Sequence, residues 1–233
     1  MSDDDHLLEL IRRADHSLVR TVDGLSEAAY SEPSLLPDWS RGHVVAHLAL
    51  NAEGLSRVLT GAHTGQPATM YDSGEARDAD IDEWAAAPAA DVRSRLLAAT
   101  TSFEQAVEAM HEKDWGARFE RTPGGASFAV ANVPLMRVRE VEIHHADLGA
   151  DYSPADWSME FAVLLLDSMT KRPYLAPFTV EATDLGRTWS YGDGEGGPRV
   201  RGPVSDLGWW LTGRGSGEGL SSDADALPRI DAW

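Results

Sequence analysis

Four long segments with apolar residues at helical spacing constrain the fold of this chain more than any other feature of its sequence. The expected helices cover residues 4–23, 41–62, 90–112 and 128–149. Ser40 is a good N-cap for the second of them, and Gly149 is suited to end the fourth. The loops between the segments allow antiparallel packing of successive helices. Residues 1–150 are therefore predicted to form a four-helix bundle, with a shorter extra helix from about residue 73 to 86.

The sequence changes character after about Asp151. Two more helices are expected at residues 154–170 and 204–212, the second of them capped by Ser205. Between them, strand-like runs separated by glycine-rich turns cover residues 178–182, 187–191 and 199–201. Residues 151–233 are thus predicted to form a small α+β domain, which gives the whole chain an α+β, two-domain fold.

The composition excludes several classes of function. The 233 residues carry a formal net charge of −18, which argues against nucleic acid and anionic membranes as partners. The absence of cysteine rules out disulfides, cysteine–zinc sites and a thiol nucleophile supplied by the chain itself. The first residues lack the apolar core of a secretory signal, and no apolar run has the length of a transmembrane helix. We therefore expect a cytoplasmic protein, either a monomer or a small homo-oligomer.

The segment MRVREVEIHHADLG, residues 136–149, carries Glu140 and His144 four positions apart. At about 100° per residue the two side chains stack on one helix face, and that face is otherwise largely apolar. A carboxylate and an imidazole on a buried face need a compensating partner. A metal ion is one such partner, and a simple Glu–His hydrogen bond at a helix seam is the alternative.

His47 is a candidate third ligand. It lies at the edge of the inner stripe of the second helix, from where it can face Glu140 and His144 across the bundle. Two histidines and one carboxylate suit zinc or another divalent first-row ion and leave a coordination position open. The alternative for His47 is a satisfied core histidine. His145 points about 100° away from His144, which suggests a supporting or surface position, and Asp147 is placed to orient a ligand or to lie at the surface or helix cap.

Two arginines lie outside the helix seams. Arg77 belongs to the segment MYDSGEARD, which follows the loop after the second helix, and Arg214 lies between two glycines in TGRGSGEG. An arginine with an open backbone around it is suited to bind a carboxylate with both arms of its guanidinium. An ordinary surface arginine is the alternative for each.

The segments LPDWSRGHVVAHLALNAEGL and MRVREVEIHHADLGADY are similar to two signatures of the mycothiol-dependent maleylpyruvate isomerase family, whose N-terminal domain is a DinB-like four-helix bundle. MYDSGEARDADI and LTGRGSGEG also resemble segments of that enzyme, so the resemblance covers nearly the whole chain. The helix motifs are shared by many DinB-like thiol-dependent enzymes, whereas the two arginine segments point to the isomerase. The clearest departure from the family pattern is His145, where a small or apolar residue is expected.

The resemblance implies metal ligands at His47, Glu140 and His144, zinc as the ion, and arginines needed for activity at Arg77 and Arg214. It also implies mycothiol as the cofactor, which suits a chain without cysteine. The implied reaction belongs to the gentisate route of aromatic catabolism. A zinc-activated thiolate adds to the cis double bond of maleylpyruvate, the bond rotates, and elimination gives fumarylpyruvate. With Arg214 in the second domain, the active site is expected in a cleft between the domains.

Two other functions remain open at this point. A mycothiol S-transferase that acts on electrophiles or on a biosynthetic intermediate would use the same metal site. A non-catalytic binding or regulatory protein would need no metal. Isomerase activity should require both Arg77 and Arg214, whereas a transferase for neutral electrophiles should tolerate the change Arg214→Ala.

Overall fold

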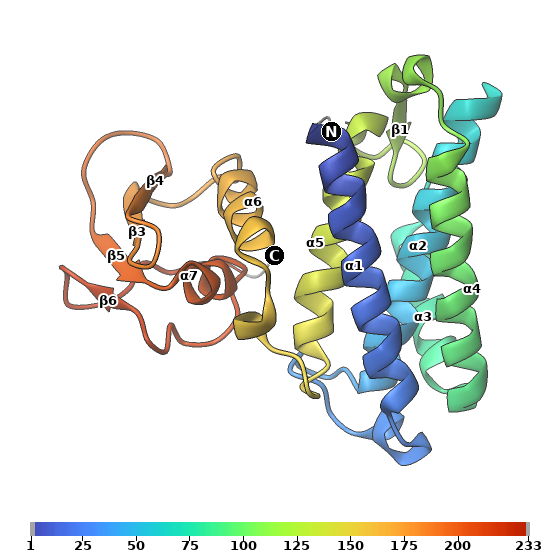
Figure 1. Cartoon of the computed structure of the whole chain (residues 1–233), viewed down its shortest axis with the longest axis horizontal. Helices are drawn as coiled ribbons and strands as arrows, with labels where there is room; N and C mark the ends of the chain where they lie inside the picture. Colours follow the sequence, from blue (N-terminus) through green and yellow to red (C-terminus); the bar gives the residue numbers. More distant parts are fainter. Residues whose placement is uncertain (1–2, 232–233) are drawn as a thin grey trace. The chain divides into compact units, whose positions relative to one another are not determined.

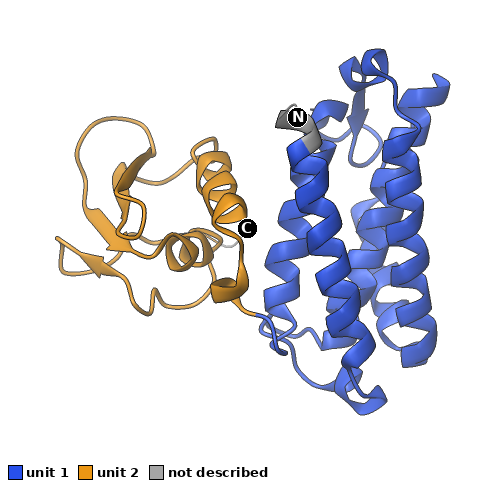
Figure 2. Ribbon diagram, viewed as in Figure 1, with its two compact units in different colours: residues 1–152 blue, residues 153–233 orange. Residues whose placement is uncertain are grey.

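The computed structural model describes residues 3–231 and divides into two compact units, residues 1–152 and residues 153–233 (Figure 2). The first unit is helical, and the second combines helices with a mixed sheet. The predicted α+β class is therefore confirmed. Within the part of the chain that the structure describes, none of the helices combines the length and apolar character needed to cross a bilayer.

The first unit is built on four long helices, with α1 beside α5 and α2 beside α4 (Figure 1). Their bounds are α1 Asp3–Gly24, α2 Arg41–Thr64, α4 Ala89–Glu108 and α5 Val133–Asp147. A shorter helix, α3 (Gly74–Ala85), packs on α2. The apolar stripes of the four long helices meet in a common core that includes Leu18, Val22, Val44, Leu48, Leu55, Leu96, Phe103, Val138 and Val141.

Local side-chain contacts fix where α2 and α3 begin. As predicted, Ser40 caps α2, and its hydroxyl accepts a hydrogen bond from the His43 backbone N–H at 3.4 Å. The His43 imidazole in turn accepts one from the Ser40 backbone N–H at 3.2 Å, so the two residues cap the helix reciprocally. Ser73 caps α3 through its hydroxyl alone, which accepts a hydrogen bond from the Ala76 N–H at 3.0 Å. These caps set the position along α2 and α3 at which later side chains leave the helices.

Two glycines on α2 allow the chain that leaves this helix to fold back onto it. A Cβ atom added to Gly54 would lie 3.0 Å from the carbonyl oxygen of Met70, and one on Gly61 would lie 2.7 Å from that of Gln66. A side chain at either position would push the returning backbone away. The glycines therefore set a path that lies directly against α2 and ends at Tyr71, whose side chain is buried.

α5 begins later than the sequence predicted. Residues 127–129 form β2 (Ser127–Ala129), which pairs antiparallel with β1 (Arg118–Glu120), and a 3-10 turn, η3 (Val130–Asn132), leads into the helix. Phe128 pairs with the buried Phe119 across this hairpin, so cross-strand packing overrides the helical pattern of the segment. Pro134 lies in the first turn of α5, where a missing N–H is tolerated.

A buried arginine ties three helices of the bundle together. Arg137 on α5 is fully buried and donates one hydrogen bond to Asp15 on α1 at 2.6 Å. Its other arm donates to the carbonyl oxygen of Leu48 at 3.0 Å and to the Asn51 side chain at 3.1 Å, both on α2. A buried charge is tolerated only when it is paired and hydrogen-bonded in this way. The contacts hold α5 against α2 close to Glu140.

The second unit contains a four-stranded sheet in the order β4-β3-β5-β6. β3 pairs antiparallel with β4 on one side and parallel with β5 on the other, and its alternate residues are buried. Helices α6 and α7 pack on each other and contact this sheet. The bounds are α6 Met159–Met169, β3 Phe178–Ala182, β4 Arg187–Tyr191, β5 Arg199–Gly202, α7 Val204–Leu211 and β6 Ser221–Ser222.

Two helix boundaries in this unit differ from the sequence prediction. The helix expected at residues 154–170 is interrupted, because a 3-10 turn, η4 (Pro154–Asp156), ends before Ser158, and Ser158 caps α6 as a new start. The last helix is preceded by Pro203 rather than capped by Ser205. Proline before a first turn is compatible with a helix start because the first N–H groups need no partner within the helix.

Candidate metal site

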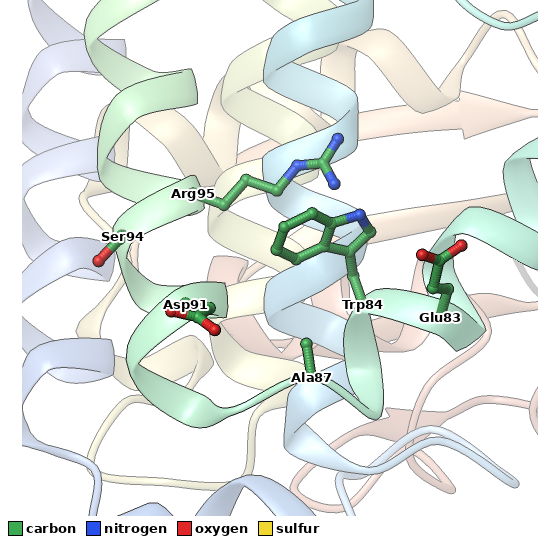
Figure 3. A pocket seen from close by; sticks show the side chains of 6 residues that line it. All are labelled: Glu83, Trp84, Ala87, Asp91, Ser94 and Arg95. Atoms are coloured by element: carbon green, nitrogen blue, oxygen red, sulfur yellow. The ribbon is translucent and has the colours of Figure 1, made fainter.

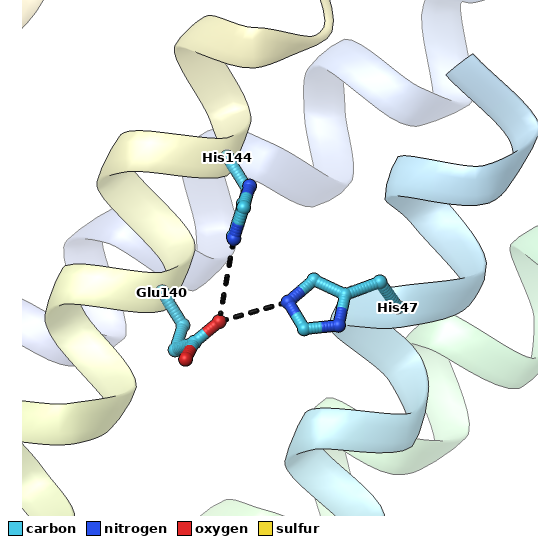
Figure 4. Close-up of side chains that lie close together, drawn as sticks. All are labelled: His47, Glu140 and His144. Carbon is cyan, nitrogen blue, oxygen red and sulfur yellow. Dashed lines mark hydrogen bonds and ion pairs between the residues drawn. The ribbon is translucent and has the colours of Figure 1, made fainter. Parts of the chain in front are cut away.

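α5 and α2 bring together the three residues that the sequence indicated as metal ligands (Figure 4). Glu140 and His144 project from successive turns of α5, and His47 faces them from α2. The Glu140 Oε2 atom lies 2.8 Å from the His47 Nε2 atom and 3.5 Å from the His144 Nε2 atom. The two imidazole rings meet edge to face, with their centroids 4.6 Å apart. We call these three residues the inner cluster.

Burial and mutual contacts shift the pKa values of the inner cluster in different directions. Burial lowers the pKa of His47 from 6.5 to about 4, although its hydrogen bond with Glu140 acts in the opposite sense. Burial also acts to lower the pKa of His144, but hydrogen bonds with Asp147 and Glu140 outweigh it, and the net shift is upward. For Glu140, burial acts to raise the pKa, and the two histidines nevertheless hold it well below its usual value. At neutral pH the inner cluster therefore holds an ionised carboxylate and a neutral His47.

Asp147 supports the inner cluster from behind. Its side chain is fully buried, and its Oδ2 atom lies 2.8 Å from the Nδ1 atom of His144. A carboxylate that accepts from Nδ1 turns the Nε2 atom of the same ring toward the cluster. Of the two roles considered for Asp147 from the sequence, the structure favours orienting His144 over a place at the surface or helix cap.

His145 lies outside the inner cluster although it is next to His144 in the sequence. It is fully buried, its Nε2 atom lies 2.8 Å from the Thr21 hydroxyl, and its ring stacks on Tyr152 at 3.6 Å. Tyr152 donates a hydrogen bond to Glu142, whose pKa burial raises to about 7. The contacts among Thr21, His145, Tyr152 and Glu142 link α1, α5 and the end of the first unit. His145 therefore packs in the interior rather than at the surface.

The inner cluster fits a divalent cation. Its three ligand atoms all lie within 4.8 Å of one another. Small movements would therefore place each of them at the roughly 2.0–2.2 Å from a central zinc ion that imidazole and carboxylate ligands adopt. Asp147 supplies the outer carboxylate that usually accompanies a metal-binding histidine. Three protein ligands would leave one tetrahedral position for an external group.

Arg77 lies against the inner cluster. It leaves the first turns of α3, and its Nη2 atom is 3.3 Å from the Nδ1 atom of His47. Its Nη1 atom pairs with the exposed Asp78 at 2.7 Å. The structure thus brings a positive charge to the edge of the candidate metal site, at the residue that the sequence indicated.

Arg214 belongs to the second unit, where its guanidinium lies 5.6 Å from the Trp209 ring centroid and donates to the carbonyl oxygen of Thr212 at 3.2 Å. It follows the end of α7, at the glycine-rich exit that the sequence indicated. Its predicted role in activity stays a prediction.

Sequence reasoning missed two residues close to Arg77. Tyr71 is 6% exposed, and both Arg77 and Arg121 place their guanidinium carbons 5.8 Å from the centroid of its ring. Tyr71 lies within the segment MYDSGEARD, but a single tyrosine in a loop carries no periodic signal. Arg121 follows β1 and reaches the same place only through the fold of the hairpin.

The described part of the chain contains a second group of possible metal ligands, which lies elsewhere in the bundle. His63 is near the end of α2, and His111 and Asp114 belong to the turn η2 (Glu112–Gly116) and its cap. The Asp114 Oδ2 atom accepts a hydrogen bond from the His111 backbone N–H at 2.9 Å and lies 2.9 Å from the His63 Nδ1 atom. We call this group the outer cluster. The turn η2 begins where the sequence predicted α4 to continue, since α4 ends at Glu108.

A shallow pocket lies at the turn between α3 and α4 (Figure 3). Arg95 stacks over Trp84 at 4.0 Å in its wall and binds Glu53 with both arms, at 2.7 and 2.6 Å. The guanidinium is therefore already satisfied, which makes this pocket a weaker site for chemistry than the inner cluster. Its lining residues are Glu83, Trp84, Ala87, Asp91, Ser94 and Arg95.

Comparison with known proteins agrees with this architecture. Crystal structures of the mycothiol-dependent maleylpyruvate isomerase and of a histidine-to-alanine mutant of it each superpose with a TM-score of 0.88. Sequence identity is 24%, and the match covers 98% of this chain and 96% of each of those chains, so the fold is shared. No curated protein matches the sequence significantly. The family model of the mycothiol maleylpyruvate isomerase N-terminal domain matches residues 11–149, which is more than half of the chain. The chain therefore belongs to the mycothiol maleylpyruvate isomerase family.

Proposed function

We propose that the protein is a metal- and mycothiol-dependent maleylpyruvate isomerase, which converts maleylpyruvate to fumarylpyruvate. The observation that supports this best is the inner cluster with Arg77 against it. His47, Glu140 and His144 would hold the cation, for which zinc is the best match to two imidazoles and one carboxylate. When bound, the cation and mycothiol supply a thiolate at neutral pH that adds reversibly to a conjugated cis double bond.

The residues of the chain have distinct tasks in this proposal. His47 is neutral at the pH of the cytoplasm because burial lowers its pKa, so its Nε2 atom is available as a ligand without loss of a proton. Asp147 keeps the His144 ring turned toward Glu140. The apolar core around the cluster limits access of water, which strengthens every charge interaction inside it.

Arg77 favours the isomerase over the S-transferase. A guanidinium 3.3 Å from His47 provides a binding group for an anionic substrate and for the negative charge that develops on an enolate. A site for neutral electrophiles has no need of that charge. Arg214 is proposed to bind the substrate as well, on the basis of the sequence resemblance.

The direct test is an absorbance assay of maleylpyruvate with the zinc-loaded protein, with and without mycothiol. We expect turnover that requires both the thiol and the metal. Turnover that is unaffected by omission of mycothiol would overturn the proposed mechanism. No turnover of maleylpyruvate, together with conjugation of mycothiol to an added electrophile, would establish the transferase instead. If elemental analysis found no divalent metal and the His47→Ala variant behaved like wild type, the protein would be a non-catalytic binding protein.

The two arginines are tested separately. Arg77→Ala and Arg214→Ala should each lower kcat/KM for maleylpyruvate by about a hundredfold or more, the size typical of a lost electrostatic group at a reacting centre. Arg201→Ala is the matched control in the second unit, since Arg201 is exposed and pairs with Glu181 at the sheet surface. If Arg214→Ala has the activity of Arg201→Ala, Arg214 has no part in the reaction.

A further inference from the structure

Tyr71 carries a buried hydroxyl group that the proposed function leaves unused. Its side chain is 6% exposed, and the hydroxyl has no partner at good hydrogen-bond geometry among residues 3–231, although the Arg77 guanidinium is close enough to act to lower its pKa. Most buried hydroxyl groups in proteins have a partner, and one without a partner destabilises the fold. The hydroxyl is therefore available to a ligand that binds beside the ring.

Two guanidinium groups lie close to the Tyr71 ring, each with its carbon 5.8 Å from the ring centroid. The Tyr71 backbone N–H donates to the carbonyl oxygen of Arg121 at 3.0 Å, which fixes the tyrosine to the end of the β1–β2 hairpin. Arg121 forms no ion pair with any residue in the described part of the chain, and the buried Nε–H of Arg77 has no acceptor there. Two positive charges and two unused donors thus meet at one place in a chain of strongly negative net charge.

This place adjoins the inner cluster. Arg77 is 3.3 Å from His47, and the charge of Glu140 acts on the Tyr71 hydroxyl. Burial first, and then Glu140, raise the pKa of Tyr71, whereas Arg77 and Arg121 act to lower it. Because the net shift is upward from 10, Tyr71 is a neutral phenol at neutral pH and acts as a hydrogen-bond donor rather than as a base.

We propose that Tyr71, Arg77 and Arg121 form a carboxylate-binding subsite beside the inner cluster. The two guanidiniums supply the charge, and the Tyr71 hydroxyl donates to one carboxylate oxygen. A carboxylate accepts several hydrogen bonds at once and can bind all three groups, whereas a neutral ligand would leave the charge of Arg121 unpaired. The subsite rests on the proposed function in one respect: the substrate is taken from it, and the inference adds Tyr71 and Arg121 as residues that hold the substrate carboxylate next to the metal-binding residues.

The test combines ligand binding with stability, because neither readout requires turnover. Maleate is the probe, and its affinity for the zinc-loaded protein is measured by calorimetric titration. Tyr71→Phe removes only the hydroxyl and keeps the ring that both arginines approach. Tyr30→Phe is the matched control: Tyr30 is also buried with an arginine 5.9 Å from its ring, but its hydroxyl already donates to the carbonyl oxygen of Val22 at 3.1 Å.

We expect Tyr71→Phe to weaken maleate binding at least about tenfold, as loss of a hydrogen bond to a charged group does, without lowering the melting temperature. Arg121→Gln should weaken binding similarly. Tyr30→Phe should lower the melting temperature and leave maleate affinity unchanged. Maleate affinity that is equal in Tyr71→Phe and wild type would show that the hydroxyl meets only solvent, and absence of maleate binding to wild type would also overturn the subsite. Maleate binding that depends on Tyr71, without any isomerase activity, would refute the proposed function and leave the subsite standing.

Discussion

The first unit contains two groups of two histidines and one carboxylate, and they differ in almost everything except composition. The side chains of His47, Glu140 and His144 are 3%, 18% and 10% exposed. In the outer cluster Asp114 is also buried, at 5%, but His63 and His111 are 33% and 66% exposed. The inner cluster comes from two long helices of the bundle, and the outer cluster comes from the end of one helix and a short turn.

The use of the carboxylates differs as well. Glu140 contacts the two imidazoles, whereas Asp114 is occupied in capping η2 through the His111 backbone N–H. The inner cluster has an outer carboxylate, Asp147, behind one ring. Ligand type and mutual distance are thus shared by the two clusters, and what sets the inner cluster apart is rigid support and the burial of both its histidines.

The largest contrast should come from removing one carboxylate charge from each cluster. Glu140→Gln keeps the shape of the side chain and should weaken zinc binding by more than about a hundredfold, beyond the effect usual for an outer partner. Competition with a chromophoric chelator measures this affinity. Asp114→Asn is the same chemical change in the outer cluster and should leave the tightest zinc site intact. The reverse result would exchange the roles of the two clusters.

The outer carboxylate behind His144 should have the next largest effect. Asp147→Asn is expected to weaken zinc binding about ten- to a hundredfold, because it removes the charge that orients the ring and makes it a stronger ligand. The control is Glu142→Gln on the same helix, whose carboxyl group bonds to Tyr152 instead of the cluster. Equal affinities for the two variants, measured with the same chelator, would show that Asp147 has only a structural role.

Acid should destabilise the metal-free protein through His47 of the inner cluster. The folded-state pKa of His47 is about 4 and its usual value is 6.5, so the unfolded chain binds the proton more tightly. The resulting loss of stability is absent above pH 6.5 and develops as the pH falls toward 4. At pH 4.5 it should reach about 2 kcal/mol.

His47→Gln should remove this part of the pH dependence, and His63→Gln should not. Urea unfolding of the metal-free variants at pH 7 and at pH 4.5 gives the two free energies of unfolding. An identical acid-induced loss in wild type and His47→Gln would contradict the assignment of the lowered pKa to His47.

The smallest effect is expected at the most exposed ligand of the outer cluster. His111→Ala should change the free energy of unfolding by less than about 0.5 kcal/mol, as is usual for a surface substitution. It should also leave the zinc content after dialysis unchanged. A loss of one tightly bound zinc ion from this variant would show that the outer cluster is a true metal site and that exposure is a poor guide to affinity here.

Much of this architecture follows from periodicity. The four bundle helices, the cap at Ser40 and the strands at residues 178–182 and 187–191 lie where apolar spacing and capping residues predicted them. The approach of His47 to Glu140 and His144 was also predictable, since inward-facing positions of neighbouring helices must meet.

Contacts made by residues without a periodic pattern could not be predicted. Phe128 was expected in a helix and lies in a hairpin, because its partner Phe119 is distant from the helical pattern of α5. The burial of His145 depends on Thr21 and Tyr152, which only the fold brings together. The same is true of Tyr71 and Arg121, whose proximity results from the path of a loop and a hairpin.

The path of residues 66–70 is determined by α2 rather than by the loop itself. Gly54 and Gly61 let residues 66–70 lie on the helix surface, and this contact places Tyr71 beside Arg77. The consequence concerns protein engineering. A loop transplanted from this chain onto a related bundle would take a different course unless the two helix glycines were transferred with it. Substrate range could in turn be altered by substitutions on a helix face that never contacts the substrate.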